Sequence, residues 1–567
     1  EIENSIYQGI IFENFNISSL LDKKVINNLF NHEGEKRSVR YFIINDEDLN
    51  IKLRDEFRAL EKKVSDNSAR SKPKFDKRKQ LLPRERVKRL LDPGSYYLPI
   101  STLAGYKIGD DDGDKNIMGG NSISGIGIVE GVRCMITASD SGIKGGSMTQ
   151  MGVEKSLRCA EIVKENKLPM INLVESAGAN LFKQSEVFIR GGRSFANLAK
   201  MSAIGIPTIS IVHGSSTAGG AYLPGLSDQV IVVKNKSKIF LAGPPLLKAA
   251  LGEIATDEEL GGADMHYNIS GLAEHMAKDD DDAIKICRDV IKNLGWNDKF
   301  TSTQSYDFKE PIYSTDELIG VVPTDYKKAY DVREVIARIV DGSEYLDFKP
   351  EFGKQTVTGT AAIHRDKVVS IGNNGPIFAD GASTAAQFIQ LCSNSNIPLI
   401  FLQNTTGYMV GTREESKRII KHGSKMIQAV TNCSVPKITL RIGASFGAGE
   451  YGMAGRSFDP RFMFSWPNNK LSVMGGEQAG KTMSQVAVES AKRKGEEPNM
   501  EMIKMIEKKV VDTYNEEGEA LFATARLWDD GIIDPRDTRK VLAECLNIVS
   551  DSEKRELRAN SFGVARM

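Results

Sequence analysis

Two glycine-rich segments have the composition of a loop that binds an anion through its backbone. The first, Gly214–Tyr222, reads GSSTAGGAY, and the second, Gly443–Tyr451, reads GASFGAGEY. Each follows an apolar run and precedes a helical stretch, so its N–H groups are presented at the start of a helix. Glycine lets a substrate approach the backbone closely and accepts positive φ. Such loops can stabilise a developing oxyanion, for example the enolate of a thioester that loses its α-proton.

These loops belong to a longer internal repeat. The matching pairs, 229 positions apart, are Pro169 and Pro398, Gly178 and Gly407, Pro207 and Pro436, Gly214 and Gly443, and Tyr222 and Tyr451. Farther along, Lys238–Gly243 matches Lys470–Gly475 at an offset of 232. A constant offset over such a length indicates one duplicated unit of domain size, far longer than a solenoid repeat.

The elements that would position the loops are short apolar runs alternating with helical stretches such as Met151–Asn166. The expected strands are Met170–Val174, Ile209–Val212, Gln229–Val233 and Ile239–Leu241. They lack polar alternation, which is typical of parallel strands covered on both faces. The pattern predicts an α/β fold made of two tandem domains. The turn Ser176–Ala179, at the end of the neighbouring strand, is expected to supply a second anion donor.

We divide the chain into an extension (1–78), a first domain (79–322) and a second domain (323–567). The extension is expected to be a peripheral helical arm that packs on a partner subunit. The expected segments are a helix at Asp46–Val64, a polar linker at Ser65–Arg78, a basic amphipathic helix at Leu81–Leu91, a looser connection at Thr301–Val322 and a helix at Lys328–Asp341.

Composition excludes several classes of protein. The 567 residues include 75 basic and 75 acidic ones, so nothing favours a nucleic acid or an anionic membrane as partner. No run approaches the length of a membrane-spanning segment. None of the six cysteines forms a Cys-x-x-Cys pair, and the six histidines are scattered, which predicts reduced thiols in a reducing compartment and no metal site. The start at Glu1 rather than Met weakly favours a processed chain.

Three short segments fit the sequence motifs of other functions. Gly475–Thr482 fits a phosphate-binding loop, but its counterpart after Gly243 is PPLLK, which cannot cradle phosphate. Gly447–Gly452 fits a dinucleotide fingerprint, but it lacks the later acidic residue that would hold a ribose. Ser445 fits a nucleophile elbow, but no histidine follows His422. We interpret all three as coincidences.

His213, just before the first loop, is a candidate general base. Its counterpart in the second copy is Ile442, and it ends an apolar strand. We therefore expect a buried structural histidine.

The chain resembles the carboxyltransferase (β) subunits of biotin-dependent acyl-CoA carboxylases from about Leu81 to Met567. The segments that carry the resemblance are Ser216–Tyr222, Ile239–Ala249, Leu260–His266, Gly447–Arg456, Val473–Ala479 and the tail Phe562–Met567. Their amino-acid sequences resemble the 3-methylcrotonyl-CoA and geranyl-CoA branch more than the propionyl-CoA branch. The paired cysteines of the zinc ribbon found in some related subunits are missing.

The resemblance implies a crotonase-like fold in each half and an active site between the N-half of one subunit and the C-half of another. Gly219 and Gly220 would hold the acyl-thioester oxyanion, and Ala448 and Gly449 the ureido oxygen of biotin. The other implied residues are Ala177, Gly178, Ala179, Gly191, Gly192 and Ala218 on the acyl-CoA side, and Thr406, Gly407, Phe446 and Gly447 on the biotin side.

The resemblance also implies the chemistry. Carboxybiotin releases CO2, the biotin anion takes a proton from the acyl-CoA, and the enolate recaptures the CO2. Because the cofactor supplies the base, the protein needs two oxyanion sites and no catalytic acid or base of its own.

The implied partners follow from what the chain lacks. It has no ATP-grasp signature and no biotinylation motif, since the nearest match, Met502–Met505, lies in the helical stretch Glu501–Glu507. Biotin would arrive on an α subunit that also holds ATP and Mg²⁺, and this chain would hold no metal. A homo-oligomer is implied, with a hexameric β core in a holoenzyme of six α and six β subunits. The compartment would be a bacterial cytoplasm or a mitochondrial matrix.

Two departures bear on the site. Methylcrotonyl-type subunits carry an aromatic residue where Gly191 stands, and geranyl-type subunits carry glycine, so we expect a substrate bulkier than methylcrotonyl. Glu450 stands where methylcrotonyl-type subunits usually have asparagine. A carboxylate aimed at the second oxyanion site would oppose anion binding, so we expect its side chain to point away.

Four other functions remain open. The chain could be the β subunit of a propionyl-CoA or other acyl-CoA carboxylase, or the α subunit of a biotin-dependent decarboxylase. A crotonase-type hydratase or isomerase would need an acidic residue, for which Glu175 is the candidate. A non-catalytic scaffold is the alternative of another class.

Overall fold

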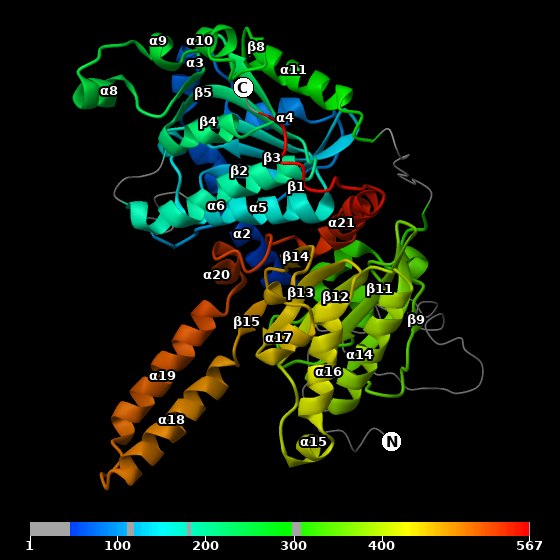
Figure 1. The fold of residues 1–567 in the computed structure, drawn as a ribbon. Coiled ribbons are helices and arrows are strands. Elements are labelled where there is room, and N and C mark those ends of the chain that lie inside the picture. Colours follow the sequence, from blue (N-terminus) through cyan, green and yellow to red (C-terminus); the bar gives the residue numbers. More distant parts are fainter. Residues whose placement is uncertain (1–45, 110–117, 179–182, 298–307, 566–567) are drawn as a thin grey trace. The chain divides into compact units, whose positions relative to one another are not determined.

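The computed structural model describes residues 46–109, 118–178, 183–297 and 308–565. In the described part, the N-half contains an eight-stranded mixed sheet of order β1-β2-β3-β4-β5-β6-β8, with β7 paired to β5 (Figure 1). Its strands are β1 (Leu98–Pro99), β2 (Ser122–Val129), β3 (Val132–Ser139), β4 (Met170–Ser176), β5 (Thr208–Thr217), β6 (Gln229–Val233), β7 (Lys238–Phe240) and β8 (His275–Ala277).

The C-half repeats this arrangement in a seven-stranded sheet of order β14-β13-β12-β11-β10-β9, with β15 paired to β13. Its strands are β9 (Leu346–Asp347), β10 (Thr356–Ile363), β11 (Asp366–Asn373), β12 (Leu399–Thr405), β13 (Lys437–Phe446), β14 (Phe462–Ser465) and β15 (Lys470–Ser472). Strands β12 and β13 begin and end 229 positions after β4 and β5, as the repeat predicted. The two halves are therefore similar α/β domains with crotonase-like topology.

Helices cover both faces of the first sheet. Apolar residues of α5 (Gln150–Asn166) and α6 (Gln184–Ala203) pack with Ile126, Met135 and Met170 on one face. On the other face, α4 (Pro83–Leu90) and α11 (Asp280–Asn293) pack against apolar strand residues such as Ile136, Ile171 and Ile209. Helix α5 begins where the side chain of Thr149 accepts a hydrogen bond from Gly152 N–H. The expected strands and the expected helices at 151–166 and 81–91 are confirmed within two residues at each end, except that β5 continues five residues past Val212.

In the C-half, α14 (Ala379–Asn394) and α16 (Ile419–Asn432) cover one face of the second sheet. The helices α18 (Gly476–Arg493) and α19 (Met500–Glu517) form a hairpin that extends from the sheet (Figure 1). The remaining helices are α7 (Tyr222–Gly225), α8 (Pro244–Leu251), α9 (Asp257–Gly261), α10 (Ala263–Asn268), α12 (Leu318–Val321), α15 (Thr412–Ser416), α17 (Ala448–Gly452) and α20 (Ala520–Ala525).

The last helix, α21 (Thr538–Glu553), joins the two halves. Its buried residues Val541, Leu542 and Leu546 share one apolar core with residues of both sheets. Arg133 of β3 bonds to Glu544 at 2.9 Å and to Asp551 at 2.5 Å. The second half therefore ends on the surface of the first.

The N-terminal helices differ from the prediction. The expected linker Ser65–Arg78 is mostly helical, because α2 (Glu47–Ala69) continues past Val64 and α3 (Lys72–Lys77) follows. Phe75 of α3 is buried, with the guanidinium of Arg78 over its ring. Phe57 and Val64 of α2 lie in an apolar core with residues of both halves, so α2 is integral to this chain rather than a peripheral arm. The segment 1–45 lies outside the described residues.

The helix expected at Lys328–Asp341 is reduced to one turn, α13 (Arg333–Ile336). Hydrogen bonds to other segments interrupt it. Val332 N–H donates to Asn374 Oδ1 at 2.8 Å, and the carboxylate of Asp341 accepts from the amides of His364 and Arg365 in the β10–β11 turn. Of the connection Thr301–Val322, the described part from 308 includes α12.

The cysteines form no disulfide, and no helix among the described residues is suited to span a membrane. All six cysteines are unpaired, and all but Cys433 are buried. No helix among the described residues is both long and apolar enough to cross a bilayer.

Candidate active site

The first glycine loop leaves β5 at Thr217 and turns into a short 3-10 helix, Ala218–Ala221. Ala218 carries the positive φ of 52°, while Gly219 and Gly220 have negative φ. A Cβ added to Gly219 would lie 3.8 Å from Phe195, and one added to Gly220 would lie 3.6 Å from Ser216. Neither backbone conformation nor internal packing requires these two glycines. A Cβ at either position would fit in ordinary van der Waals contact with these neighbours.

The second loop also has a residue of positive φ where it leaves its strand. Gly447, which matches Ala218, has φ of 55°, and helix α17 then begins at Ala448. A Cβ on Gly449 would lie 2.9 Å from Gly407 Cα, so this glycine is required by packing. The two loops therefore share a positive φ before a helix start but use glycine for different reasons.

The amides of both loops lie in the first turn of a helix, where few intrahelical acceptors are available. Gly219 and Gly220 lie in the 3-10 helix, and Ala448 and Gly449 lie at the start of α17. Among the described residues, none of the hydrogen bonds formed outside the helices uses these four amides. The arrangement can donate to an anion at each loop.

A second structural repeat supports the loops from the neighbouring strands. Strands β4 and β12 each contain a register shift at the same position, two residues before their ends. The Ser176 hydroxyl accepts from Gly178 N–H at 3.1 Å, and the Thr405 hydroxyl accepts from Gly407 N–H at 3.2 Å. Gly178 and Gly407 both have positive φ. These hydrogen bonds fix the two strand-end turns beside the loops.

The second donor expected at the Ser176–Ala179 turn is not offered by its first amides. Ala177 N–H donates to Gly145 O at 3.2 Å, and Gly178 N–H is bonded to Ser176. Ala179 lies outside the described residues. Gly219 and Gly220 therefore remain the expected donors at the first site.

Gly191 and Gly192 lie in the middle of α6, where a Cβ on either would meet nothing within 4 Å. Phe195 is four residues after Gly191, so the two share a face of the helix. Since Phe195 reaches the position of Gly219, Gly191 faces the region of the first loop. Two glycines inside a helix cost about 1 kcal/mol each, and packing does not explain them.

Beside the second loop lies a cavity of about 420 Å³ that includes the predicted residues Thr406 and Phe446. Tyr326 packs edge-on against Phe446, with ring centroids 5.0 Å apart. Lys327 forms an ion pair with Glu477 at 2.7 Å on the rim, where Lys481 also lies. The sequence reasoning missed Tyr326 and Lys327, which precede the second half of the repeat.

The segment spelled like a phosphate-binding loop lines the same cavity. Helix α18 begins at Gly476, so Gly475–Thr482 is mostly helical and forms no extended loop around a phosphate. Its match to that motif is therefore coincidental. The segment nevertheless lines the cavity beside Phe446, one of the residues expected on the biotin side.

The other candidate side chains are held by internal bonds. The Ser445 hydroxyl is buried and bonds to Gln403 Oε1 at 2.9 Å. His213 is fully buried, with Nδ1 3.0 Å from Asp280. Burial, aided by the charge of Arg86, lowers the pKa of His213 and keeps it neutral. The structural role expected of His213 is confirmed.

Glu175, the candidate acid of a hydratase, is bound on the core side of the sheet. Its carboxylate accepts from Arg86 at 2.7 Å and from Arg78 at 3.2 Å, and it is 4% exposed. It is therefore not available to an acyl chain at the first loop.

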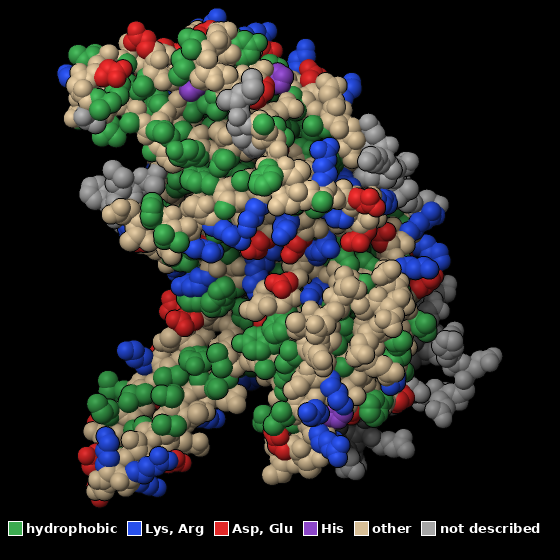
Figure 2. All heavy atoms as spheres, viewed as in Figure 1, with side chains coloured by type: hydrophobic (Ala, Val, Ile, Leu, Met, Phe, Trp, Pro, Cys, Tyr) green, Lys and Arg blue, Asp and Glu red, His purple; other side chains and the backbone are tan. Residues whose placement is uncertain are grey.

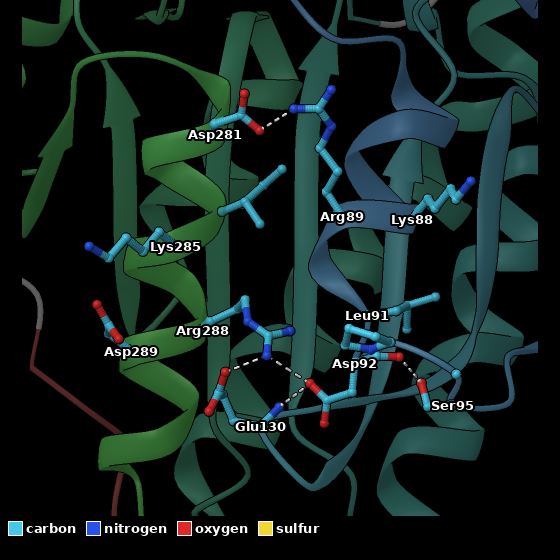
Figure 3. A pocket seen from close by; sticks show the side chains of 13 residues that line it. Lys88, Arg89, Leu91, Asp92, Ser95, Glu130, Asp281, Lys285, Arg288 and Asp289 are labelled. Carbon is cyan, nitrogen blue, oxygen red and sulfur yellow. Dashed lines mark hydrogen bonds and ion pairs between the residues drawn. The ribbon is translucent and has the colours of Figure 1, made fainter.

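A cavity of about 680 Å³ lies between α4 and α11 (Figure 3). Its charged residues are largely paired with one another: Arg89 with Asp281, and Arg288 with Asp92 and Glu130. None of the loop residues lines it. We therefore place the active site at the glycine loops and not in this cavity.

A comparison with family models decides the class of protein. The model of the carboxyl transferase domain matches residues 74–564. The chain belongs to the carboxyl transferase family. Within it, the chain groups with the β subunits of biotin-dependent acyl-CoA carboxylases.

Relatives and a solved structure agree with this placement. The methylcrotonoyl-CoA carboxylase β chain of Dictyostelium discoideum is 48% identical over 493 residues, which are 86% of this chain and 83% of the relative. That of Arabidopsis thaliana is 47% identical over 499 residues, 86% and 84% of the two chains. The β subunit of P. aeruginosa geranyl-CoA carboxylase is 50% identical, with a TM-score of 0.86, covering 94% of this chain and all of that one.

Among the described residues of this carboxyl transferase, the candidate side chains Glu175, His213 and Ser445 are all bonded within the chain. The described residues contain no cluster of His, Cys, Asp and Glu side chains suited to a metal ion. The departure at Glu450 is also accounted for: its carboxylate bonds to Arg441 at 2.8 Å, so it points away from the amides of α17, as expected.

Proposed function

We propose that the two glycine loops bind the two anions of a carboxyl transfer to a branched α,β-unsaturated acyl-CoA. Gly219 and Gly220 hold the thioester oxygen, and Ala448 and Gly449 hold the ureido oxygen of biotin. The observation that carries this proposal is the pair of equivalent loops, each at the start of a helix, whose amides make no hydrogen bond outside those helices among the described residues.

Biotin supplies the carboxyl group and the base, and the residues of this chain supply position and charge stabilisation. Proton loss from an unsaturated thioester spreads negative charge onto its oxygen, where the amides of Gly219 and Gly220 donate. Each such donor contributes roughly 3–4 kcal/mol to the transition state. Thr406, Gly407, Phe446 and Gly447 surround the second loop and would orient the bicyclic ring there.

The acyl chain is proposed to lie along α6. Ala177, Gly178, Ala179 and Ala218 would border the thioester, and Gly191 and Gly192 would leave room farther along the chain. The open space at Gly191, on the face that carries Phe195, supports an acyl group longer than methylcrotonyl, such as geranyl.

The division of labour between domains is proposed as well. The domain 79–322 would bind acyl-CoA, and the domain 323–567 would bind biotin carried by an α subunit, which would also hold ATP and Mg²⁺. We place the holoenzyme in a bacterial cytoplasm or a mitochondrial matrix.

Exposed apolar side chains support an oligomer in which the N-half of one subunit meets the C-half of another. Figure 2 shows apolar surface along the α18–α19 hairpin and over α6 and α8. The exposed residues are Phe188, Ile189, Leu246, Leu251, Met483, Val486, Met502 and Met505. Apolar surface of this extent marks interaction sites. A hexameric core of such subunits is the proposed assembly.

The test is carboxyl transfer by the purified holoenzyme with methylcrotonyl-CoA, geranyl-CoA and propionyl-CoA. We expect biotin-dependent turnover that is fastest with geranyl-CoA. A preference for methylcrotonyl-CoA would refute the longer acyl chain alone. Failure to carboxylate any of the three, with biotin present on the α subunit, would refute the proposed function. The molecular mass of the isolated chain in solution tests the proposed oligomer. The mass of a monomer would exclude it.

A further inference from the structure

The second loop is tied to the core by a buried ion pair that the first loop lacks. Arg441, in the middle of β13, is fully buried, and its Nη2 donates to Glu450 Oε1 at 2.8 Å. Its Nη1 donates to the carbonyl of Trp528 at 3.0 Å. Glu450 Oε1 also accepts from the amide of Arg456 at 3.1 Å, just beyond the loop. One carboxylate thus connects α17 to a strand and to the segment that follows.

The first copy of the repeat has apolar residues at both equivalent positions. Arg441 corresponds to Val212 and Glu450 to Ala221, and both of these are buried in an apolar cluster. The two members of the pair therefore differ together from their counterparts. The first loop also has a residue of positive φ at this position and turns into a helix without such a pair, so these local features do not require it.

We propose that Arg441 and Glu450 are positioning residues for the second oxyanion site. The inference rests on the proposed function of Ala448 and Gly449. Hydrogen bonds have direction, whereas apolar contacts do not, so the pair fixes the direction in which the first-turn amides of α17 point. Arg441 also neutralises Glu450. An unpaired carboxylate in this first turn would repel the anion that the amides bind.

Three variants test the proposal in the holoenzyme: Arg441→Val, Glu450→Ala, and the double variant that reproduces the first copy. The readout is kcat, KM for the acyl-CoA, and KM for free biotin in the reverse reaction with the carboxylated CoA product. We expect Arg441→Val to lower kcat by about 100-fold, as for loss of an oxyanion donor, with KM for the acyl-CoA unchanged. The double variant should recover about 10-fold of this loss, because it leaves no unpaired carboxylate in the first turn of α17.

The exposed Arg493 of α18 provides the control, Arg493→Val, which should transfer at the rate of the unaltered protein. A normal rate in Arg441→Val, a double variant no better than Arg441→Val, or a loss confined to KM for the acyl-CoA would each overturn the positioning role. If Arg441→Val does not fold, Glu450→Gln and Glu450→Ala replace it. Glu450→Gln keeps a hydrogen-bond acceptor and should exceed Glu450→Ala by about 10-fold, and equal rates would overturn the role.

The outcomes separate the two proposals. No biotin-dependent turnover by the unaltered protein refutes the proposed function. Full turnover by both the unaltered protein and Arg441→Val refutes the positioning role alone.

Discussion

At the scale of single residues, glycine has two different uses in the two loops. Gly449 is required by its neighbours, since a Cβ there would meet Gly407 and Thr405 at 2.9 Å. Gly219 and Gly220 have room for a Cβ, so their small size serves whatever binds beside them. The space around a glycine thus distinguishes the proposed functional glycines of the first loop from those that packing requires.

Gly220→Val should stop carboxyl transfer with little change in stability. The branched side chain would occupy the space proposed for the thioester oxygen, and we expect transfer to fall by at least about 100-fold. The measurement is kcat/KM for the acyl-CoA, together with thermal unfolding. Gly225→Val, in the adjoining α7 where a Cβ also meets nothing, is the control and should remain active. Near-normal transfer by Gly220→Val would show that the first site lies elsewhere.

Gly191→Phe should change the choice of acyl chain. A ring on this face of α6 would occupy the space beside Phe195 and reject the longer substrate. We expect the ratio of kcat/KM for geranyl-CoA to that for methylcrotonyl-CoA to fall by about 10-fold. Lys200→Phe, on the opposite side of the same helix, should leave the ratio unchanged. An unchanged ratio in Gly191→Phe would show that this face of α6 does not contact the acyl chain.

At the scale of elements, a buried cluster of charges fixes α3, α4 and α11 to the strands before the first loop. Arg86 of α4 bonds to Glu175 at 2.7 Å and to Asp280 at 3.3 Å, and Asp280 meets His213. Burial opposes the ionisation of Asp280, but its hydrogen bond with His213 and the charge of Arg86 outweigh this and lower its pKa below the usual range. Glu175 directly precedes the Ser176–Ala179 turn, and His213 directly precedes the first glycine loop. The cluster therefore holds in place the strand ends that carry these two segments.

Arg86→Met should destabilise the protein strongly. It leaves Glu175 and Asp280 buried without their shared cation, which costs about 3–5 kcal/mol of unfolding free energy. Arg89→Met is the matched control on the same helix, because Arg89 is exposed and pairs with exposed Asp281. Its cost should stay below about 1 kcal/mol. Urea unfolding followed by tryptophan fluorescence measures both, and equal costs would contradict the role of the cluster.

At the scale of the whole described molecule, one buried aspartate links the halves. Asp530 bonds to Arg158 of α5 at 2.8 Å and to Arg456, which follows the second loop, at 3.1 Å. Burial alone would raise the pKa of Asp530, but the charges of Arg158 and Arg456 outweigh burial and lower it to about 2. The helix beside the first site and the segment behind the second are therefore held by the same carboxylate.

This link predicts a loss of stability in acid. The pKa of Asp530 is lower in the folded protein than in the unfolded chain, so its contribution is present above the ordinary value of 3.8 and is lost as pH falls towards 2. The stability difference between the unaltered protein and Asp530→Asn should shrink by about 2 kcal/mol over that range. Asp512→Asn, on the exposed side of α19, serves as control. A difference independent of pH would contradict the assigned pKa.

The sequence alone determined the duplication, the fold class and the positions of the two loops. Strands and their following turns are local features, and the offset of 229 carried the bounds of β4 and β5 onto β12 and β13 without error. The sequence also located Gly219, Gly220, Ala448 and Gly449, because small residues after an apolar run identify a backbone site without reference to distant segments.

Only the tertiary structure decided which segments meet. The integration of α2 into the core, the interruption at Val332, and the pairing of Glu450 with Arg441 all depend on contacts between separate segments. Arg158 and Asp530 lie 372 positions apart. Their attraction arises only after the chain has packed, because a buried charge takes whichever counter-ion the fold brings near it.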